Sequence, residues 1–292
     1  MGRLVDLTLN GVTYGMIYAA VALGLVLIWR ATRVINFAQG AMAMFTTYVA
    51  VTLIDQNIPY WVAFTAALLL GLVLGAAVEV VLIRGLRGGS ELSPVIVTLG
   101  FLILLEGVAG ALWGGGDRSF PAYFSQIGLV VAGRQIAFSA FDAFTVGVVL
   151  LLMALMWILF QTTDLGLRMR ASAFAPEVAR LLGVRVGGML TLGWALAALA
   201  GSLAGLLVAP KVLLFPNNMD EVLVFGFTGA VMGGLDSPVG ALVGGVVTGL
   251  VLSYVGGYLG SSLETVGALV LLLVVLSVRP QGIFSRPALR TV

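Results

Sequence analysis

The chain has 292 residues, of which 60% are hydrophobic and 10% are charged, and its formal net charge is +2. A soluble domain carries about a quarter charged residues, so this composition excludes a water-facing surface over most of the chain and predicts an integral membrane protein. Cysteine and histidine are absent. Their absence excludes thiolate or imidazole metal sites, cysteine nucleophiles and histidine general bases, and we predict neither a catalytic nor a metal site.

Long apolar stretches follow one another along the chain. A bilayer core about 30 Å thick needs about 20 helical residues for each crossing. Nine stretches reach or approach this length, and they lie at 7–29, 37–54, 60–83, 93–113, 142–160, 187–209, 219–235, 238–255 and 262–278. The stretches at 37–54, 219–235 and 238–255 are short and interrupted by glycine or polar residues. We predict an all-α polytopic membrane protein, a helical bundle of about nine transmembrane helices within a range of about eight to ten.

The positions of the basic residues predict how the chain is oriented. With nine crossings and an outer N-terminus, eleven arginines fall on the inner face. Four basic residues fall outside, and they are Arg3, Arg118, Arg134 and Lys211. Because basic residues concentrate in cytoplasmic loops, we predict an outer N-terminus and a cytoplasmic C-terminus.

Glycine pairs at four-residue spacing recur inside the stretches. They are Gly11/Gly15, Gly71/Gly75, Gly201/Gly205, Gly229/Gly233, Gly240/Gly244 and Gly245/Gly249. Small residues at this spacing let helix backbones approach closely in lipid, which predicts a tightly packed bundle. Alternatively, glycine-rich breaks line a path through discontinuous helices. If 142–160 is a connector, the stretches before it and after it run in opposite directions, as an inverted repeat requires.

Residues near the ends of stretches, most of them polar and uncharged, are candidates for a solute path. Asn36, Gln39 and Gly40 stand at the start of the second stretch, where Asn36 alternatively caps a helix. Further candidates at the outer mouth are Asn217, Asn218 and Asp220. For Asn217 and Asn218 the alternative is an ordinary turn after Pro216.

Two carboxylates fall inside predicted helices. Glu106 lies near the middle of 93–113. A charge there costs roughly 2.5–3.5 kcal/mol, so the side chain must be protonated, paired or facing water, and it is a candidate for the path. Glu79 lies about one turn from the inner end of its stretch, where it can snorkel to the interface or pair with Arg84, and a structural role is favoured.

Polar segments at 114–141 and 161–186 separate the stretches. The outer one, 114–141, alternates apolar and polar residues and predicts a small hairpin or an interfacial helix. The inner one ends in APEVARLLGVRV, where Pro176 suits the first turn of a helix and Gly183 suits its end. We predict a helix of about two turns over 176–182, on a cytoplasmic loop of a single transmembrane domain that covers the whole chain.

The predicted short helix has one apolar face. Val178, Leu181 and Leu182 fall on that face, with Glu177 and Arg180 beside it. Such a helix is too short to be stable alone. It suits insertion into a groove on another protein, or alternatively it forms a lid on the inner surface of the bundle or on the headgroups.

Several segments carry a resemblance to a known family. EVARLLG, at 177–183, resembles the E-A-A-x-x-x-G signature of ABC importer permeases, with Val178 in place of the first alanine. The branched-chain amino-acid (Liv-type) permeases, and their H subunit in particular, resemble this chain at INFAQGAMAM (35–44), VTLGF (97–101), GLRMRASAFAPEVARLLGVRV (166–186), GGLDSPVGALVGG (233–245) and RPQGIF (279–284). The chain departs from the importer pattern in lacking an I-x-L-P group, since GWAL stands near there, and in carrying Gln39 where members commonly have histidine.

The resemblance implies a permease subunit of a binding-protein-dependent ABC importer in a bacterial or archaeal cytoplasmic membrane. It implies a second permease subunit, in a heterodimer or alternatively a homodimer, two cytoplasmic ATPases that bind the ATP, and an extracytoplasmic substrate-binding protein, with no nucleic acid and no cofactor of its own. The usual cargo is leucine, isoleucine and valine, sometimes other amino acids, amides or urea. The residues implied to couple to the ATPases are Pro176, Glu177, Val178, Ala179, Arg180, Leu181, Leu182 and Gly183.

The source of energy separates the alternative functions. An ATP-driven pump in one chain needs G-x-x-x-x-G-K-[ST], and the single lysine, Lys211, stands in VAPKVLLFP. A partner must therefore supply ATP hydrolysis if the chain belongs to an ABC importer. The alternatives are an ion-gradient-driven carrier that acts alone and a passive channel for a small neutral solute such as urea.

Overall fold

The computed structural model describes residues 2–86, 89–90, 92–131 and 133–284. Arg87, Arg286 and Arg290, which contribute to the predicted charge asymmetry, lie outside the described residues. The helices are α1 (Gly2–Thr32), α2 (Gln39–Asp55), α3 (Tyr60–Ala77), α4 (Leu92–Trp113), α5 (Ala140–Thr162), α6 (Asp164–Phe174), α7 (Pro176–Leu181), α8 (Val186–Val208), α9 (Asp220–Gly233), α10 (Pro238–Tyr258) and α11 (Glu264–Val278). A π-helix, Val78–Ile83, and a 3₁₀ turn, Arg84–Leu86, continue α3, and a second 3₁₀ turn, Ser261–Leu263, precedes α11.

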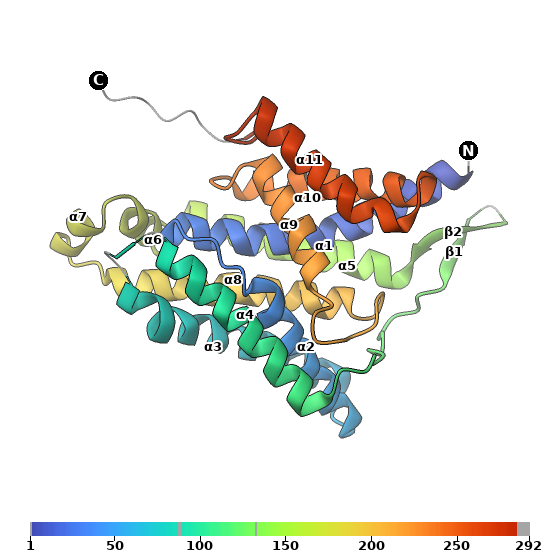
Figure 1. Ribbon diagram of the computed structural model, residues 1–292, viewed down its shortest axis with the longest axis horizontal. Helices are drawn as coiled ribbons and strands as arrows, with labels where there is room; N and C mark the ends of the chain where they lie inside the picture. Colours follow the sequence, from blue (N-terminus) through green and yellow to red (C-terminus); the bar gives the residue numbers. More distant parts are fainter. Residues whose placement is uncertain (1, 87–88, 91, 132, 285–292) are drawn as a thin grey trace.

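The two ends of the bundle differ in structure (Figure 1). At one end, the antiparallel strands β1 (Gly128–Val131) and β2 (Arg134–Ser139) form the hairpin that was one of the two structures predicted for 114–141. This hairpin end also holds the N-terminus, because Asp6 bonds to Arg134 at 2.9 Å. At the other, α7 end, the short helices α6 and α7 project from the bundle.

The predicted helical bundle is confirmed, but the count of nine crossings is not. Within the described residues, seven helices are long and apolar enough to span a membrane, and they are Gly2–Thr32, Tyr60–Leu86, Leu92–Trp113, Ala140–Thr162, Val186–Val208, Pro238–Tyr258 and Ser261–Val278. The other two predicted stretches are helical as α2 and α9, with 17 and 14 residues. At 1.5 Å per residue α9 is only about 21 Å long, which is shorter than a bilayer core.

The two short helices α2 and α9 begin next to each other inside the bundle. A Cβ on Gly40, in the first turn of α2, would lie 3.1 Å from the carbonyl oxygen of Met219, the residue before α9. From there α2 runs to Asp55, which lies 4.0 Å from Arg118 in the segment before the hairpin. The segment that follows α9 carries Asp236, which pairs at 2.7 Å with Arg33 beyond the end of α1. Helices α2 and α9 therefore run in opposite directions, as do the helices that precede them, α1 and α8. This is the arrangement that an inverted repeat requires.

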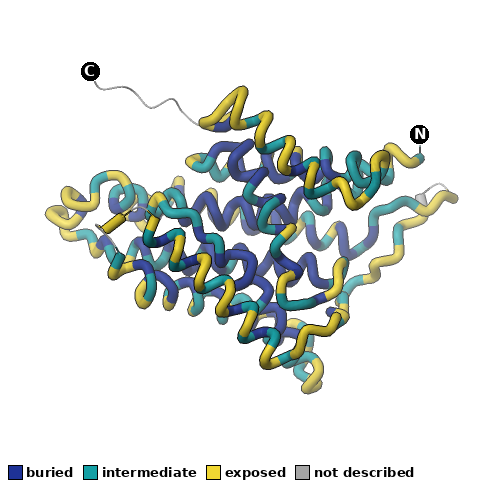
Figure 2. The backbone as a smooth tube through the Cα atoms, in the orientation of Figure 1, coloured by how far each residue is buried: buried dark blue, intermediate teal, exposed yellow. Residues whose placement is uncertain are grey.

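Helix α1 lies at the centre of the bundle (Figure 2). Its most apolar window is 89% buried, whereas the windows of α4 and α11 are 17% and 6% buried. Glycines bring α1 and α10 together, since a Cβ on Gly15 would lie 2.7 Å from Cα of Val246 and a Cβ on Gly245 would lie 2.5 Å from Cα of Ala19. The prediction that the glycine pairs serve close helix packing is confirmed at this contact.

Replacing Gly245 with alanine is expected to destabilise the bundle. The new methyl group would overlap the backbone of α1, which cannot rotate away, so we expect a loss of about 1–3 kcal/mol, as for overpacked cores. Gly147→Ala is the matched control, because Gly147 lies on α5 with nothing within 4 Å of its missing Cβ. Titration of the purified protein with SDS measures both variants. Equal midpoints for Gly245→Ala and the parent protein would contradict this close contact.

The Glu79 carboxylate is neutralised inside the bundle. Glu79 is fully buried, and it accepts hydrogen bonds from Arg84 at 2.9 Å and from the Thr191 hydroxyl on α8 at 2.5 Å. The predicted pairing with Arg84 is confirmed, and Glu79 has a structural role here.

Candidate functional site

The short helix α7 is built by local signals at both of its ends. Pro176 occupies its first turn, where the missing N–H costs nothing. Gly183 has φ +81°, and the N–H of Val184 donates to the carbonyl of Ala179 at 2.9 Å, which closes the C-terminus. The predicted helix over 176–182 is thus present as Pro176–Leu181, with Leu182 as its C-cap.

The apolar face of α7 points away from the bundle. Ala179 is 2% exposed and packs against Val186 and Leu190 of α8. By contrast, Leu181 is 88% exposed and Leu182 is 78% exposed, and Glu177, Val178 and Arg180 are exposed as well. The helix α7 is therefore not a lid held on the bundle by its large apolar side chains, because the small side chain of Ala179 makes the contact with the bundle.

Asn36 and Gln39 are buried where α2 begins. Gln39 is 1% exposed, and its Nε2 donates to the carbonyl of Ala197 on α8 at 2.7 Å. Asn36 donates to Gln39 Oε1 at 3.3 Å and accepts from the N–H of Ala38 at 3.1 Å. The alternative reading of Asn36, as a helix cap, is wrong, because Ala38 is the N-cap of α2 and Asn36 instead closes the turn before it. These bonds satisfy polar groups of a non-helical segment inside the bundle, as lipid requires.

Glu106 and Gly40 both lie near the start of α9, where Gly40 approaches Met219. The Glu106 carboxyl interacts with the carboxyl of Asp220 at the first residue of α9. Its Oε1 atom is buried without a hydrogen-bond partner among the described residues. Asn36, Gln39 and Gly40 are buried where α2 begins. Glu106 of α4 lies beside Asp220, the residue that follows the Met219 approached by Gly40.

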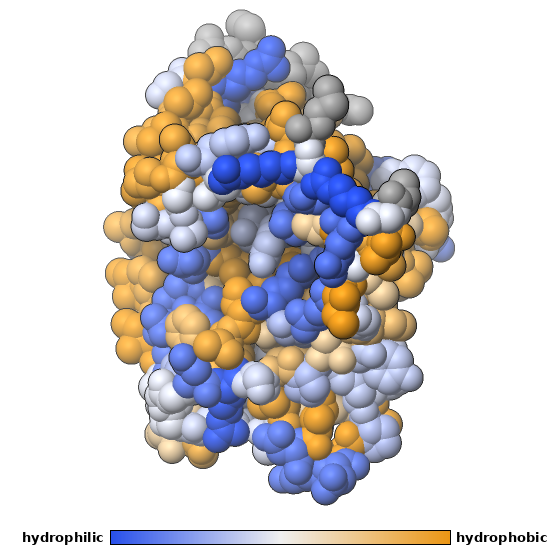
Figure 3. Space-filling view, turned by 90° about the vertical axis from the view of Figure 1, so that its right-hand side faces the viewer, coloured by the Kyte–Doolittle hydropathy of each residue, from blue (hydrophilic) through white to orange (hydrophobic). Residues whose placement is uncertain are grey.

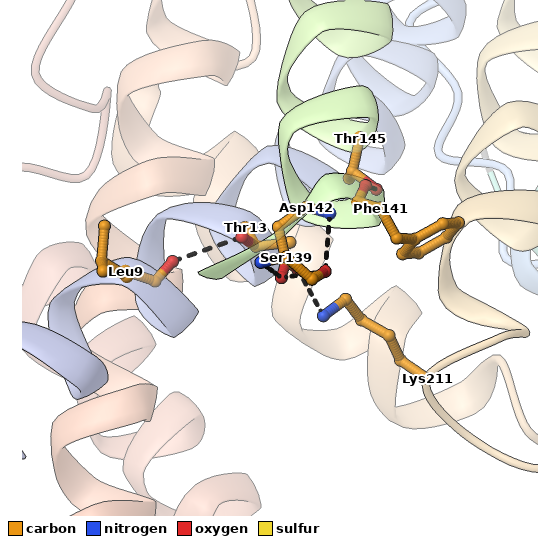
Figure 4. A network of polar contacts seen from close by, with 7 residues as sticks. All are labelled: Leu9, Thr13, Ser139, Phe141, Asp142, Thr145 and Lys211. Carbon is orange, nitrogen blue, oxygen red and sulfur yellow. Dashed lines mark hydrogen bonds and ion pairs between the residues drawn. The ribbon is translucent and has the colours of Figure 1, made fainter. Parts of the chain in front are cut away.

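A buried ion pair near the hairpin end was not predicted from the sequence. Lys211 Nζ lies 2.6 Å from Asp142 Oδ1, and the two side chains are 13% and 6% exposed. Asp142 also forms a capping box with Ser139 at the start of α5, and Figure 4 shows the three side chains converging. The signal available in the sequence was a serine three residues before an aspartate, directly ahead of an apolar run.

A cavity near the hairpin end was also missed. It has a volume of about 430 Å³ and lies between α1, α9, α10 and the segment after α8. Its polar lining comes mainly from Asn10, Tyr14, Tyr18, Asn218, Glu221, Ser253 and Glu264. Of these, the sequence singled out Asn218 alone, because the others are spread over α1, α9, α10 and α11, and no local pattern shows that these helices meet.

Comparison with known proteins extends over nearly the whole chain. Residues 7–278 match the family described as "Branched-chain amino acid transport system / permease component". The chain is 29% identical over 301 residues to the high-affinity branched-chain amino acid transport system permease protein LivH of Escherichia coli K12, covering 97% of this chain and 96% of that protein. It is 29% identical over 302 residues to the corresponding permease protein BraD of Pseudomonas aeruginosa, with the same coverage of 97% and 96%.

An archaeal relative and a solved structure extend these similarities. The probable LivH of Methanocaldococcus jannaschii is 30% identical over 249 residues, covering 80% of this chain and 75% of that protein. Among solved structures, PsaBC from Streptococcus pneumoniae in complex with Fab matches with a TM-score of 0.53 at 15% identity, covering 96% of this chain and 93% of that one. At that identity the likeness is one of fold.

Proposed function

Because the chain belongs to the family of branched-chain amino acid transport permease components, we propose that it forms the membrane passage through which a branched-chain or related small amino acid enters the cell. Its relatives LivH and BraD are named as permease proteins of such systems, and the similarity covers 96% of each. The chain works as a transport subunit, and separate ATPase subunits supply the energy, since the full sequence contains no Walker A motif.

We propose that α7 is the contact through which the ATPases move this subunit. The supporting observation is its solvent-facing apolar surface, with Leu181 88% and Leu182 78% exposed beside Arg180. Apolar side chains on a short projecting helix gain free energy when a partner groove buries them. The loop at 161–186, which contains α6 and α7, would carry the movement into the adjoining helices α5 and α8.

We propose that the α7 end faces the cytoplasm and that the hairpin end faces outward. Among the described residues, the basic side chains assigned to the α7 end are Arg30, Arg33, Arg84, Arg168, Arg170, Arg180, Arg185 and Arg279. Those assigned to the hairpin end are Arg3, Arg118, Arg134 and Lys211. This asymmetry follows the bias of cytoplasmic loops and puts the N-terminus outside and the C-terminus inside. The extracytoplasmic binding protein would then dock at the hairpin end, and a second permease subunit, in a heterodimer, would complete the passage.

Single cysteines test this orientation without background, because the chain has none of its own. Leu181→Cys and Ile127→Cys place a thiol on exposed positions at opposite ends of the bundle. In intact cells we expect a membrane-impermeant maleimide to label position 127 and to label position 181 only after the membrane is broken. The reverse pattern would contradict the orientation.

Reconstitution tests the transport proposal. Proteoliposomes that contain this chain, its partner permease and both ATPases should take up L-leucine only when ATP and the binding protein are present. The carrier alternative draws support only from the Glu106–Asp220 carboxyl pair. Uptake by this chain alone on a proton or sodium gradient would establish the carrier and overturn the importer, and equilibration without accumulation would establish a passive channel.

A further inference from the structure

The cavity near the hairpin end has a composition suited to one kind of ligand. Figure 3 looks onto this end and shows hydrophilic side chains gathered around a recess in the face. The cavity of about 430 Å³ lies within one copy of the chain, away from both α7 and the buried Gln39. Two carboxylates, Glu221 at the start of α9 and Glu264 at the start of α11, belong to its lining.

Neither carboxylate has a basic partner among the described residues. The ion pairs there use other acids, and Glu221 receives one long hydrogen bond, from the Thr265 hydroxyl at 3.5 Å. Lys211 is close, with Nζ 5.2 Å from the Tyr14 ring centroid, but its charge is already paired with Asp142 at 2.6 Å. At the rim, Arg3 donates to the carbonyl of Gly257 and stacks over Tyr258. Each carboxylate lies in the first turn of its helix, where the helix dipole favours a negative charge, and Glu221 is exposed to solvent. Neither carboxylate forms an ion pair with a described basic side chain, so both remain available to a cationic ligand.

An amide oxygen in the same cavity also has no partner. Asn218 is 7% exposed, and its Nδ2 donates to the carbonyl of Leu213 at 3.4 Å. Its Oδ1 accepts no hydrogen bond within the described structure. Buried carbonyl oxygens are rarely left unsatisfied, because a lost hydrogen bond costs free energy, so this oxygen calls for a donor from outside the chain.

Aromatic rings line the inner wall of the cavity. The rings of Tyr14 and Tyr18 stack with centroids 6.3 Å apart, and Phe225 packs edge-on against Tyr18 at 5.3 Å. Aromatic faces attract organic cations, and acidic and carbonyl oxygens accept the hydrogens of an ammonium group. A hard divalent metal needs more oxygen ligands than two carboxylates provide, and the described residues contain no cluster of three or more metal-binding acids.

We propose that this cavity binds the ammonium group of an amine-bearing solute, with Glu221 and Glu264 as counter-charges and Asn218 Oδ1 as a third acceptor. The inference deepens the proposed function, on which it rests only for the identity of the solute, an α-amino acid on its way inward. The apolar wall around Tyr18 and Phe225 accommodates an aliphatic side chain next to the ammonium group.

Three related probes show which chemical group of leucine the cavity binds. The full-length chain in lipid nanodiscs is tested with L-leucine, with 3-methylbutylamine, which lacks the carboxylate, and with 4-methylpentanoate, which lacks the ammonium group. In saturation-transfer NMR we expect the first two to bind and the acid not to bind. The double variant Glu221→Gln/Glu264→Gln should weaken amine binding at least tenfold, because it removes both charges and keeps the shape of each side chain. Asp117→Asn, an exposed acid outside the cavity, is the matched control and should leave binding unchanged.

Several results would overturn the assignment. The first is that 4-methylpentanoate binds as strongly as 3-methylbutylamine, and the second is that the double variant binds the amine unchanged. The third is that a low concentration of magnesium chloride or sodium chloride displaces the amine, which would indicate a metal site. If the double variant fails to fold, Glu221→Gln and Asn218→Ala are tested singly. Unaltered amine binding in both single variants would also overturn the assignment. Because these measurements contain no ATPase, they stand or fail independently of ATP-driven uptake.

Discussion

Leu181→Asp is expected to abolish binding of the ATPase subunits while the chain still inserts into the membrane. Leu181 is 88% exposed, so its replacement removes no contact within the chain. If a partner groove buries this side chain, the substitution removes about 1.5–3 kcal/mol of binding free energy, which is roughly a tenfold or greater loss of affinity. Binding of the variant must also desolvate the new carboxylate. Co-purification of tagged ATPase with the permease from detergent extracts measures the effect.

Control variants separate this contact from general damage. Ile127→Asp puts the same charge at a side chain that is 73% exposed at the hairpin end, and it should leave ATPase binding unchanged. Arg180→Glu and Gly183→Pro should resemble Leu181→Asp, since the first reverses a flanking charge and the second removes the N–H that bonds to the carbonyl of Arg180 at 3.0 Å. Normal co-purification of Leu181→Asp would show that α7 is not the docking helix.

Lys211→Met is expected to be among the most destabilising single substitutions in the chain. It leaves Asp142 buried, with Oδ1 unpaired and only Oδ2 bonded to Ser139 at 2.7 Å. Removing one partner of a buried pair costs about 3–5 kcal/mol, and the retained capping bonds favour the lower end of that range. Free energies of unfolding from SDS titration measure the loss.

A double-mutant cycle identifies the cause. Lys211→Met/Asp142→Asn should recover part of the lost stability, because the amide removes the buried charge and keeps an acceptor for Ser139. The surface pair Arg33–Asp236, with side chains 61% and 50% exposed, provides the comparison, and Arg33→Met should cost less than about 1 kcal/mol. Equal effects at the two pairs would mean that burial does not govern the Lys211 contact.

Local patterns in the sequence predicted those parts of the structure that depend on neighbouring residues. Apolar length predicted where helices lie, proline and glycine predicted the ends of α7, and the spacing of Glu79 and Arg84 predicted their pairing. Glycine spacing predicted close contact, although it could not say that Gly15 of α1 meets Val246 of α10.

Features that depend on three-dimensional arrangement were missed or miscounted. Composition gives the length of an apolar stretch but not the depth at which its helix starts, so α2 and α9 were counted as full crossings although they begin inside the bundle. The sequence left Asn36 between a path residue and a helix cap, because a local pattern cannot show that its side chain bonds to Gln39, which in turn bonds to α8. The carboxylates of the hairpin-end cavity stand on helices whose proximity no local pattern encodes.

The central position of α1 has a consequence for biosynthesis. α1 leaves the ribosome long before its principal neighbours α8, α9 and α10, which lie in the second half of the chain. Until those helices are translated and inserted, the glycine-containing surface of α1 around Gly11 and Gly15 must face lipid or the insertion machinery. A nascent chain that ends before Pro238 therefore leaves that surface uncovered, and the bundle closes only late in translation.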